Sequence, residues 1–509
     1  MTSHSRRIAK NAAIVAGATL LSRILGFARD LVIAYALGAG LFADAFFVAF
    51  RLPNLLRRLF GEGSLTMAFV PVFTRIRTED GEPEAFAMAR SILVWLVLIL
   101  CAITLAAVIF ARPLTLLIAP GFADNPGQIE LTANLIRICF PYIVLICGVA
   151  LCMGILNASG HFLAPALAPC ILNIVLIASA LTAVFLGWSV AHALAAGVLM
   201  AGVLQWLFQQ PFLKKLGFTW KGSWSWFHPG VKRTGLIMLP TVLGAAVYQI
   251  NILLGTLLAS FLSIGSISFL YYADRLVQFP LGVFGLAVST AALPSLAALA
   301  AEKDTEGFKE ALNSSLRLTL FICLPATAGL IALSEPIVGL LFGHGAFTGD
   351  AVQDTARALV GYALGLPAFA MVRPLVSGFY ALEDTRTPVL VACVCLVLYV
   401  LAALVLMRVL NHVGLALATT ISSWANFFML THFLRRKIGV WADFAGPSKK
   451  SLFLSLGLGV GAFLTLPLKF WAVALIPAWA VVYMGLALTL SLPEAKMILK
   501  AVGKRKQSA

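Results

Sequence analysis

The residues best suited to chemistry in this sequence are charged side chains that interrupt its first two hydrophobic stretches. On insertion scales, each charge near the middle of a bilayer costs about 2.5–3.5 kcal/mol. Such side chains are therefore expected to face protein or trapped water and to serve a function. Basic residues outnumber acidic ones here, so the segment is suited to hold an anion. The charged residues of segment 22–71 are Arg23, Arg29, Asp30, Asp44, Arg51, Arg57, Arg58 and Glu62.

The first stretch carries two arginines and one aspartate. A helix over this stretch rises ~1.5 Å per residue and places Arg23 close to the bilayer centre, too deep to reach the surface easily. Asp30 follows seven residues later and shares the helix face of Arg23, whereas Arg29 lies roughly 120° around the helix. One aspartate cannot neutralise both arginines.

The second stretch adds Arg51 and Arg57 against Asp44, which leaves an excess of positive charge. Two interpretations stay open from these residues. Internal ion pairs could fix helix packing, or the arginines could bind an anion, and their number in adjacent stretches favours binding. Arginine suits a buried anion because its fork of donors stays protonated, whereas a buried lysine can lose its proton.

Composition places these stretches in a membrane. Hydrophobic residues make up 61% of the 509 residues, charged residues 11%, and the mean hydropathy is +0.97, which excludes a soluble globular protein. The net charge of +16 comes from short basic clusters between apolar runs, so it indicates membrane topology and no nucleic-acid partner. The basic clusters precede odd-numbered runs, which predicts cytoplasmic N- and C-termini.

Apolar runs long enough to cross a bilayer predict an all-α, multi-pass membrane protein with fourteen transmembrane helices. The runs fall at 12–36, 40–60, 85–111, 130–158, 165–187, 190–212, 233–262, 267–299, 308–342, 351–381, 387–409, 413–434, 450–468 and 472–492.

An internal repeat organises these helices. Pro71 and Pro294 lie at an offset of 223 along the chain, as do Pro165 and Pro388, each pair within similar segments. A repeat of six helices predicts two pseudo-symmetric lobes in the same orientation around a central cavity, made of helices 1–6 and 7–12, with two helices added at the C-terminus. The expected domains are 1–220, 221–440, and 441–509 with its basic cytoplasmic tail.

The second lobe brings its own charges in YYADRLVQFP (271–280), near the repeat equivalent of FFVAFRLP (46–53). We expect Asp274 and Arg275 to approach the same cavity. The alternative is that Asp274 pairs with a neighbouring basic group and only fixes packing.

Other chemistry is not indicated. No GxxxxGK[ST] loop, paired-histidine motif or zinc-type cysteine spacing occurs, so we expect no enzyme, no metal and no cofactor. We expect the energy to come from the membrane potential, an ion gradient or downstream consumption. The aromatic run WKGSWSWFH (220–228) beside Lys214 and Lys215 is typical of an interfacial anchor, with partner docking as the other option.

The sequence resembles the MurJ (MviN) family of lipid II flippases, within the multidrug/oligosaccharidyl-lipid/polysaccharide exporter superfamily. The resemblance covers essentially residues 1–440, and related exporters lack the arginine-rich first helix pair. The segments that carry it are SRILGFARD, ADAFFVAFRLPNLLRRLFGEG, AFVP, APGFAD, FPY, ILNASGHFLAPALAPCILN, YYADRLVQFP and GFYALEDTRTP.

The resemblance implies a bacterial inner-membrane protein that moves lipid II, an undecaprenyl-diphosphate-linked peptidoglycan precursor, from the cytoplasmic to the periplasmic leaflet. Its implied partners are lipid II, membrane lipids and the cell-wall synthesis machinery, and the last two helices imply a groove for the polyprenyl tail. The family's cavity arginines match Arg23, Arg29, Arg57 and Arg275. Its accompanying polar positions match Asp30, Asp44, Asn54 and Glu62, and with Arg51 and Asp274 these form the expected supporting or gating residues.

Two other functions remain open. An exporter of another lipid-linked oligosaccharide or of a small molecule would share the superfamily fold, and the small-molecule exporter would not need the last two helices. A non-transporting membrane scaffold would tolerate loss of charge throughout the first two spans.

Overall fold

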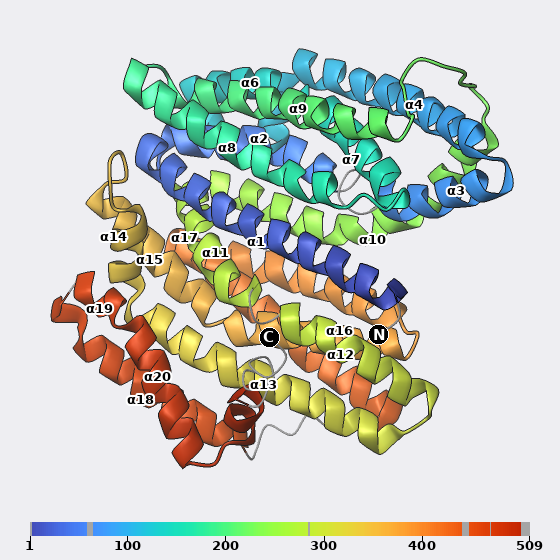
Figure 1. Cartoon of the computed structure of the whole chain (residues 1–509). Coiled ribbons are helices and arrows are strands. Elements are labelled where there is room, and N and C mark those ends of the chain that lie inside the picture. The colour runs from blue at the N-terminus through green and yellow to red at the C-terminus, as the bar shows by residue number, and fades with distance from the viewer. Residues whose placement is uncertain (1–2, 59–64, 283–285, 440–446, 469, 500–509) are drawn as a thin grey trace. The chain divides into compact units, whose positions relative to one another are not determined.

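A computed structural model describes residues 3–58, 65–282, 286–439, 447–468 and 470–499, and its regular elements over these ranges are all helices (Figure 1). The expected all-α class is therefore confirmed. The chain forms two compact units, Met1–Gly265 with Gly345–Phe347, and Ser266–His344 with Thr348–Ala509. We describe each unit by itself.

The first unit contains ten α-helices and a short 3₁₀ helix over its described residues. They are α1 (Ser3–Leu37), α2 (Leu41–Leu56), α3 (Leu65–Glu79), α4 (Glu82–Ile109), α5 (Ala111–Ile118), η2 (Pro120–Asp124), α6 (Pro126–Cys139), α7 (Tyr142–Ala158), α8 (Leu163–Leu186), α9 (Val190–Lys215) and α10 (Pro229–Ser260).

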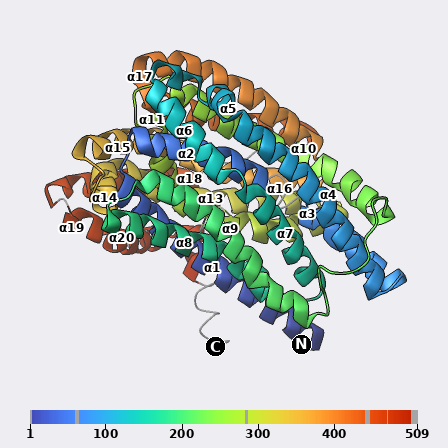
Figure 2. The ribbon, with the colours of Figure 1, turned by 90° about the horizontal axis from the view of Figure 1, so that it is seen from above.

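Close helix pairs hold this unit together. Helix α8 packs on α1 and α9, and α7 packs on α3, α4 and α9, as Figure 2 also shows for α8 beside α1 and α9. Gly154 on α7 admits the Phe69 ring of α3, since an added Cβ would lie 2.7 Å from that ring. Small residues at such contacts let helix backbones approach closely in the absence of a hydrophobic driving force between membrane helices.

Helix α10 belongs to the first unit because it packs on α3 and η2. The first compact unit therefore extends to Gly265, beyond the expected lobe boundary between residues 220 and 221. The segment Gly345–Phe347 also joins this unit, where the Ala346 amide donates to the Tyr35 carbonyl at the end of α1 (2.9 Å).

The second unit is also built of helices over its described residues. They are α11 (Ser266–Pro280), α12 (Leu286–Ala301), α13 (Thr305–Ala332), α14 (Ser334–Phe342), α15 (Gly349–Ala363), α16 (Leu366–Ala381), α17 (Arg386–Ile438), α18 (Pro447–Leu464), η4 (Leu466–Leu468), α19 (Phe470–Ala474) and α20 (Ile476–Thr489). Its core joins α12, α13, α16 and α17, with Phe308, Met371, Phe379 and Phe427 almost fully buried.

The last helices pack on α13. Helix α18 lies along it, and the buried Tyr483 hydroxyl of α20 donates to the Phe321 carbonyl of α13 (2.9 Å). The polar hydroxyl of this aromatic anchor is thus satisfied inside an otherwise apolar contact.

Helix bounds recur at the same offset of 223 along the chain. Helix α4 (82–109) corresponds to α13 (305–332). The start of α8 corresponds to the start of α17, and the end of α9 corresponds to the end of α17. The packing pairs recur as well, since α3–α7, α4–α7 and α2–α6 correspond to α12–α16, α13–α16 and α11–α15. The repeat seen in the sequence is therefore present in the helices of the structure.

Six helices are long and apolar enough to span a membrane, or up to eight spans if each of two bent helix pairs counts as one, within the described residues. Two features account for part of the difference from the expected fourteen. Helix α17 breaks at Asn411, whose backbone is non-helical, and its two parts match the separate runs 387–409 and 413–434. The run 267–299 divides into α11 and α12, of which α11 has 15 residues. Helix α3 was not among the expected spans.

Candidate anion-binding residues

Arg29 is held in place by two helices of the first unit. Its Nε and Nη2 donate to Asp30 Oδ1 (3.0 and 2.7 Å), and its Nη1 donates to Asn173 Oδ1 on α8 (3.0 Å). Asn173 Nδ2 donates in turn to the Ser22 carbonyl of α1 (3.1 Å), so the amide orientation is fixed. Asp30 is 2% exposed, and the Arg29 side chain is 15% exposed. Arg29 is therefore positioned by hydrogen bonds, as a residue that must meet a ligand in one geometry requires.

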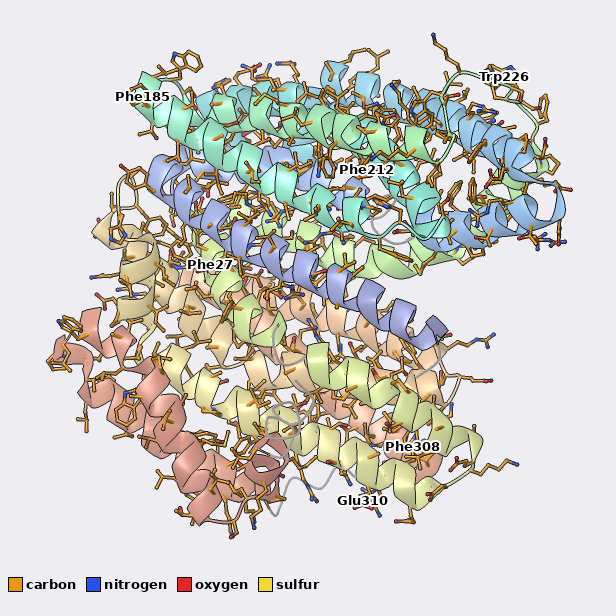
Figure 3. All side chains as sticks on the ribbon, viewed as in Figure 1. Phe27, Phe185, Phe212, Trp226, Phe308 and Glu310 are labelled. Carbon is orange, nitrogen blue, oxygen red and sulfur yellow. The ribbon has the colours of Figure 1, made fainter. Side chains whose placement is uncertain are left out.

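Arg23 lies on another face of α1. It is exposed, like Leu20 and Ile24 beside it, and it forms no hydrogen bond or ion pair with a described residue. Figure 3 labels Phe27 on the same helix. The expected 120° separation explains the difference, because Arg29 turns toward α8 while Arg23 does not. Asp30 serves Arg29, and the guanidinium of Arg23 remains available.

Asp44 caps a turn. It is buried in the first turn of α2, and its Oδ2 accepts a hydrogen bond from the Gly265 amide (2.7 Å). Its carboxylate thus binds a backbone donor that precedes α11. This contact is consistent with a supporting role.

The end of α2 holds Arg57 through its own helix. Asn54 Oδ1 accepts from Arg57 Nε (3.2 Å) and Nη2 (2.8 Å), a contact between residues three apart on neighbouring helical positions. Arg51 is half-buried one turn earlier. Pro53 lies inside the helix, which ends at Leu56. Glu62 lies outside the described residues.

The charged pair of the second unit lies on α11. The Arg275 guanidinium carbon is 4.7 Å from the centre of the Tyr271 ring, within the range of a cation–π contact. Asp274 Oδ1 accepts from Gln278 Nε2 (3.4 Å) and forms no ion pair with any residue described. The alternative that Asp274 fixes packing through a basic neighbour therefore gains no support.

Two positioning residues were missed in the sequence. Asn173 had a signal, because it interrupts the apolar run around 171–175, but its partner lies 144 residues away. Tyr271 precedes Arg275 by four residues, a spacing that places side chains together on a helix. The sequence alone predicts a positioning role for neither residue.

The carboxylate of Asp384 accepts hydrogen bonds from other residues of the protein. Its Oδ2 accepts from Lys437 Nζ (2.8 Å) and Thr387 Oγ1 (2.8 Å), and its Oδ1 accepts from the Thr387 amide (3.0 Å). The hydrogen bond from Lys437, followed by that from the Thr387 amide, holds the pKa of this carboxyl well below its usual range. No group of three potential metal ligands occurs in the part of the chain that the structure covers.

The sequence matches a known protein family over most of its length. A family described as "Lipid II flippase MurJ" matches residues 33–484. The chain belongs to the lipid II flippase MurJ family. It is 38% identical over 439 residues to a probable lipid II flippase MurJ of Vibrio cholerae, covering 84% of this chain and 82% of that protein. It is 36% identical to the lipid II flippase MurJ of Burkholderia cenocepacia, covering 89% and 87%.

Solved structures agree with MurJ membership. A lipid II flippase MurJ in an inward closed conformation matches with a TM-score of 0.78 and 26% identity, covering 98% of this chain and all of that one. An inward-facing multidrug resistance MATE family transporter of the MOP superfamily matches with a TM-score of 0.68 and 15% identity, covering 84% of this chain and 98% of that one. The second likeness shows a shared fold. A MurJ-type, multi-pass inner-membrane transporter that is not an enzyme is therefore established.

Proposed function

We propose that this protein flips lipid II from the cytoplasmic to the periplasmic leaflet and that arginines of α1, α2 and α11 bind its diphosphate. One observation in the first unit supports the binding site most directly. Asp30, the acidic residue of the α1 apolar stretch, is bonded to Arg29, so the exposed guanidinium of Arg23 has no counter-charge on its helix.

Each arginine has a distinct part in the proposal. Arg29, oriented by Asp30 and Asn173, and Arg275, oriented by the Tyr271 ring, present fixed donors to the diphosphate. Arg23 contributes a flexible donor, and Arg57 guides entry. Charge-assisted, two-pronged hydrogen bonds from guanidinium to phosphate oxygens are strong and directional.

The membrane arrangement completes the mechanism. The repeat at an offset of 223 residues supports fourteen spans with both termini cytoplasmic. Its two halves would open a central cavity alternately to the two sides of the membrane. The groove between α18 and α20, about 360 Å³ and lined by apolar side chains with Lys450, suits the start of a polyprenyl chain. The membrane potential or an ion gradient would drive the cycle, because moving one charge through 100 mV is worth about 2.3 kcal/mol.

The test is leaflet accounting of lipid II in cells depleted of their own flippase. Cells that express the protein should expose precursor to an added periplasmic enzyme that cleaves lipid II, and Arg23→Ala, Arg29→Ala or Arg275→Ala should strand the precursor on the cytoplasmic side. Arg75→Ala is the matched control, because Arg75 forms an exposed pair with Glu79. Unchanged exposure of precursor in all three cavity variants, at normal protein levels, would refute the clamp.

A small-molecule exporter is the second candidate, favoured only by the multidrug-transporter fold. Removal of residues 450–495 separates the two. Lipid II flipping should cease because the tail groove is lost, whereas a drug exporter that uses only the two repeat halves would retain efflux.

A further inference from the structure

The loop between α9 and α10 is built onto the side of α4. Arg90 of α4, 9% exposed, donates from Nε to the Ser223 carbonyl (2.7 Å) and from Nη1 to the Thr219 carbonyl (3.1 Å). The Ser225 amide donates to Ser91 Oγ (2.9 Å). A buried charge that binds backbone carbonyls fixes one loop conformation.

The loop continues along α4 toward the apolar part of that helix. Trp95 Nε1 donates to the Trp226 carbonyl (2.9 Å), and the two indole rings meet edge to face with centroids 5.8 Å apart. Trp95 follows Arg90 by five residues, which is about 7 Å along the helix axis. Figure 3 labels Trp226 at the outer end of this loop.

The depth of the loop follows from α4 itself. Between Arg90 and its end at Ile109, α4 has no charged residue, and this run extends about 28 Å, close to the hydrocarbon thickness of a bilayer. Arg90 thus marks one membrane boundary. The Trp226 contact lies just inside that boundary, where indole rings are enriched.

The aromatic side chains of the loop divide into two groups. Phe218 and Trp220 turn inward, and Trp220 Nε1 donates to Gln210 Oε1 (2.6 Å). Trp224, Trp226 and Phe227 turn outward and are 42%, 48% and 90% exposed. An ordered loop that exposes three large apolar rings is expected to bind a membrane or another molecule through them.

Basic residues flank the exposed rings along the chain. All are exposed, and none forms an ion pair with a residue within the described ranges, whereas the nearby Glu84 is occupied by His228 (3.1 Å). The basic residues are Lys214, Lys215, Lys221, Lys232 and Arg233. Apolar rings at a bilayer boundary with unpaired cations beside them match the two attractions that bind a protein segment to an anionic lipid surface.

We infer that residues 219–228 form an interfacial anchor that inserts Trp224, Trp226 and Phe227 among the headgroups of one leaflet and binds anionic phospholipid through Lys221 and its basic neighbours. This anchor is separate from the diphosphate site. It would hold the connection between the two repeats at a fixed depth in the membrane.

The first experiment measures depth with spin labels in the full-length protein. In a background with the exposed Cys101 and Cys393 replaced by alanine, one cysteine is introduced at position 227, at Asp80 as the aqueous control, or at Leu105 as the lipid-facing control. In vesicles, the accessibility of the label to oxygen relative to a water-soluble nickel complex should lie, at position 227, between the values at positions 80 and 105. Accessibility equal to that at position 80 would overturn the anchor and indicate a protein-docking surface.

The second experiment tests the lipid class. The measured quantity is again the accessibility of the label at 227 to oxygen relative to the nickel complex. Adding phosphatidylglycerol to phosphatidylcholine vesicles should increase this ratio, and Lys221→Glu should lower it about fivefold or more. Lys309→Glu, a change of the same charge on α13, should leave it unchanged. Equal ratios in the two kinds of vesicle would contradict recognition of anionic lipid.

Discussion

Arg29 and Arg23 lie on one helix in different states. Arg29 is bonded to Asp30 and to Asn173, whereas Arg23 is exposed and has no described partner. A fixed donor can meet the diphosphate at little entropic cost, while a mobile one can follow it as it moves. The proposed clamp thus combines a rigid and a flexible guanidinium within two helical turns.

Asn173→Ala tests the rigid part of the clamp. Loss of Asn173 Oδ1 removes one hydrogen bond from Nη1 of Arg29 and should slow lipid II flipping about 3- to 10-fold, less than Arg29→Ala, because one hydrogen bond to a charged group is lost while the ion pair remains. The initial flipping rate at equal protein level is the measurement. Asn134→Ala removes a similar contact with Arg137 on an exposed surface and should have no effect.

The sequence predicted the charged residues of the site better than their partners. It showed that Asp30 could not serve both arginines, but helix geometry alone favoured Arg23, which shares its face, and the structure pairs Asp30 with Arg29. Side chains of adjacent residues can reach each other when a third group, here Asn173 from a distant helix, fixes the guanidinium. A single sequence does not reveal that tertiary contact.

Asp384 joins the two ends of α17. It accepts hydrogen bonds at the start of the helix, from Thr387, and from Lys437 near the helix end. Asp384→Asn should lower the stability of the protein at neutral pH by about 1–3 kcal/mol, the range for hydrogen bonds to a charged group. Thermal unfolding in detergent measures this difference.

The pH dependence of that difference has a defined sign. Because the pKa of the Asp384 carboxyl is lowered in the folded state, its contribution is complete above the unfolded pKa of about 3.9 and declines as the pH falls toward the folded value. The stability gap between the unsubstituted protein and the Asp384→Asn variant should be constant from about pH 5 to 8 and shrink below about pH 4. A gap that grows on acidification would contradict the assignment.

Gly38 allows the end of α1 to meet the segment Gly345–Phe347. Its φ is +71°, and an added Cβ would collide with the Ala346 carbonyl. Gly38→Ala should therefore destabilise the protein by more than about 1 kcal/mol and lower Tm. Gly17→Ala is the matched control on α1, since nothing lies within 4 Å of its added Cβ, and helix propensity there favours alanine.

Elements were predictable where apolar length alone defines them. Runs 165–187 and 190–212 correspond closely to α8 and α9. Helix α3 was missed because its 15 residues mix apolar and basic side chains, and the α11–α12 division was missed because hydropathy is continuous across it. Hydropathy reports burial in lipid, whereas helix ends depend on local backbone geometry.

The whole molecule carries an asymmetric charge on a symmetric scaffold. At the repeat offset, Arg29 corresponds to Ile252, and Arg57 corresponds to Pro280. The net-positive cavity that we propose should respond to the membrane potential because each charge is worth about 2.3 kcal/mol per 100 mV.

Collapsing the potential should therefore change the facing state that we propose. Leu20→Cys, on the exposed face of α1 near Arg23, reports that state through its reaction with a water-soluble thiol reagent. We expect the labelling rate to change several-fold when an ionophore abolishes a potential of about 100 mV. Identical labelling with and without the potential would contradict voltage coupling.

The matched helix ends of the two repeats also bear on how this chain arose. Segments that begin and end in register, yet differ in their charged side chains, are the product expected from tandem duplication of a half-length ancestor followed by unequal substitution. Such an ancestor would need a second copy of itself in the membrane to complete the fold. Fusion then let each copy change alone, so an arginine gained by one half no longer had to be tolerated twice.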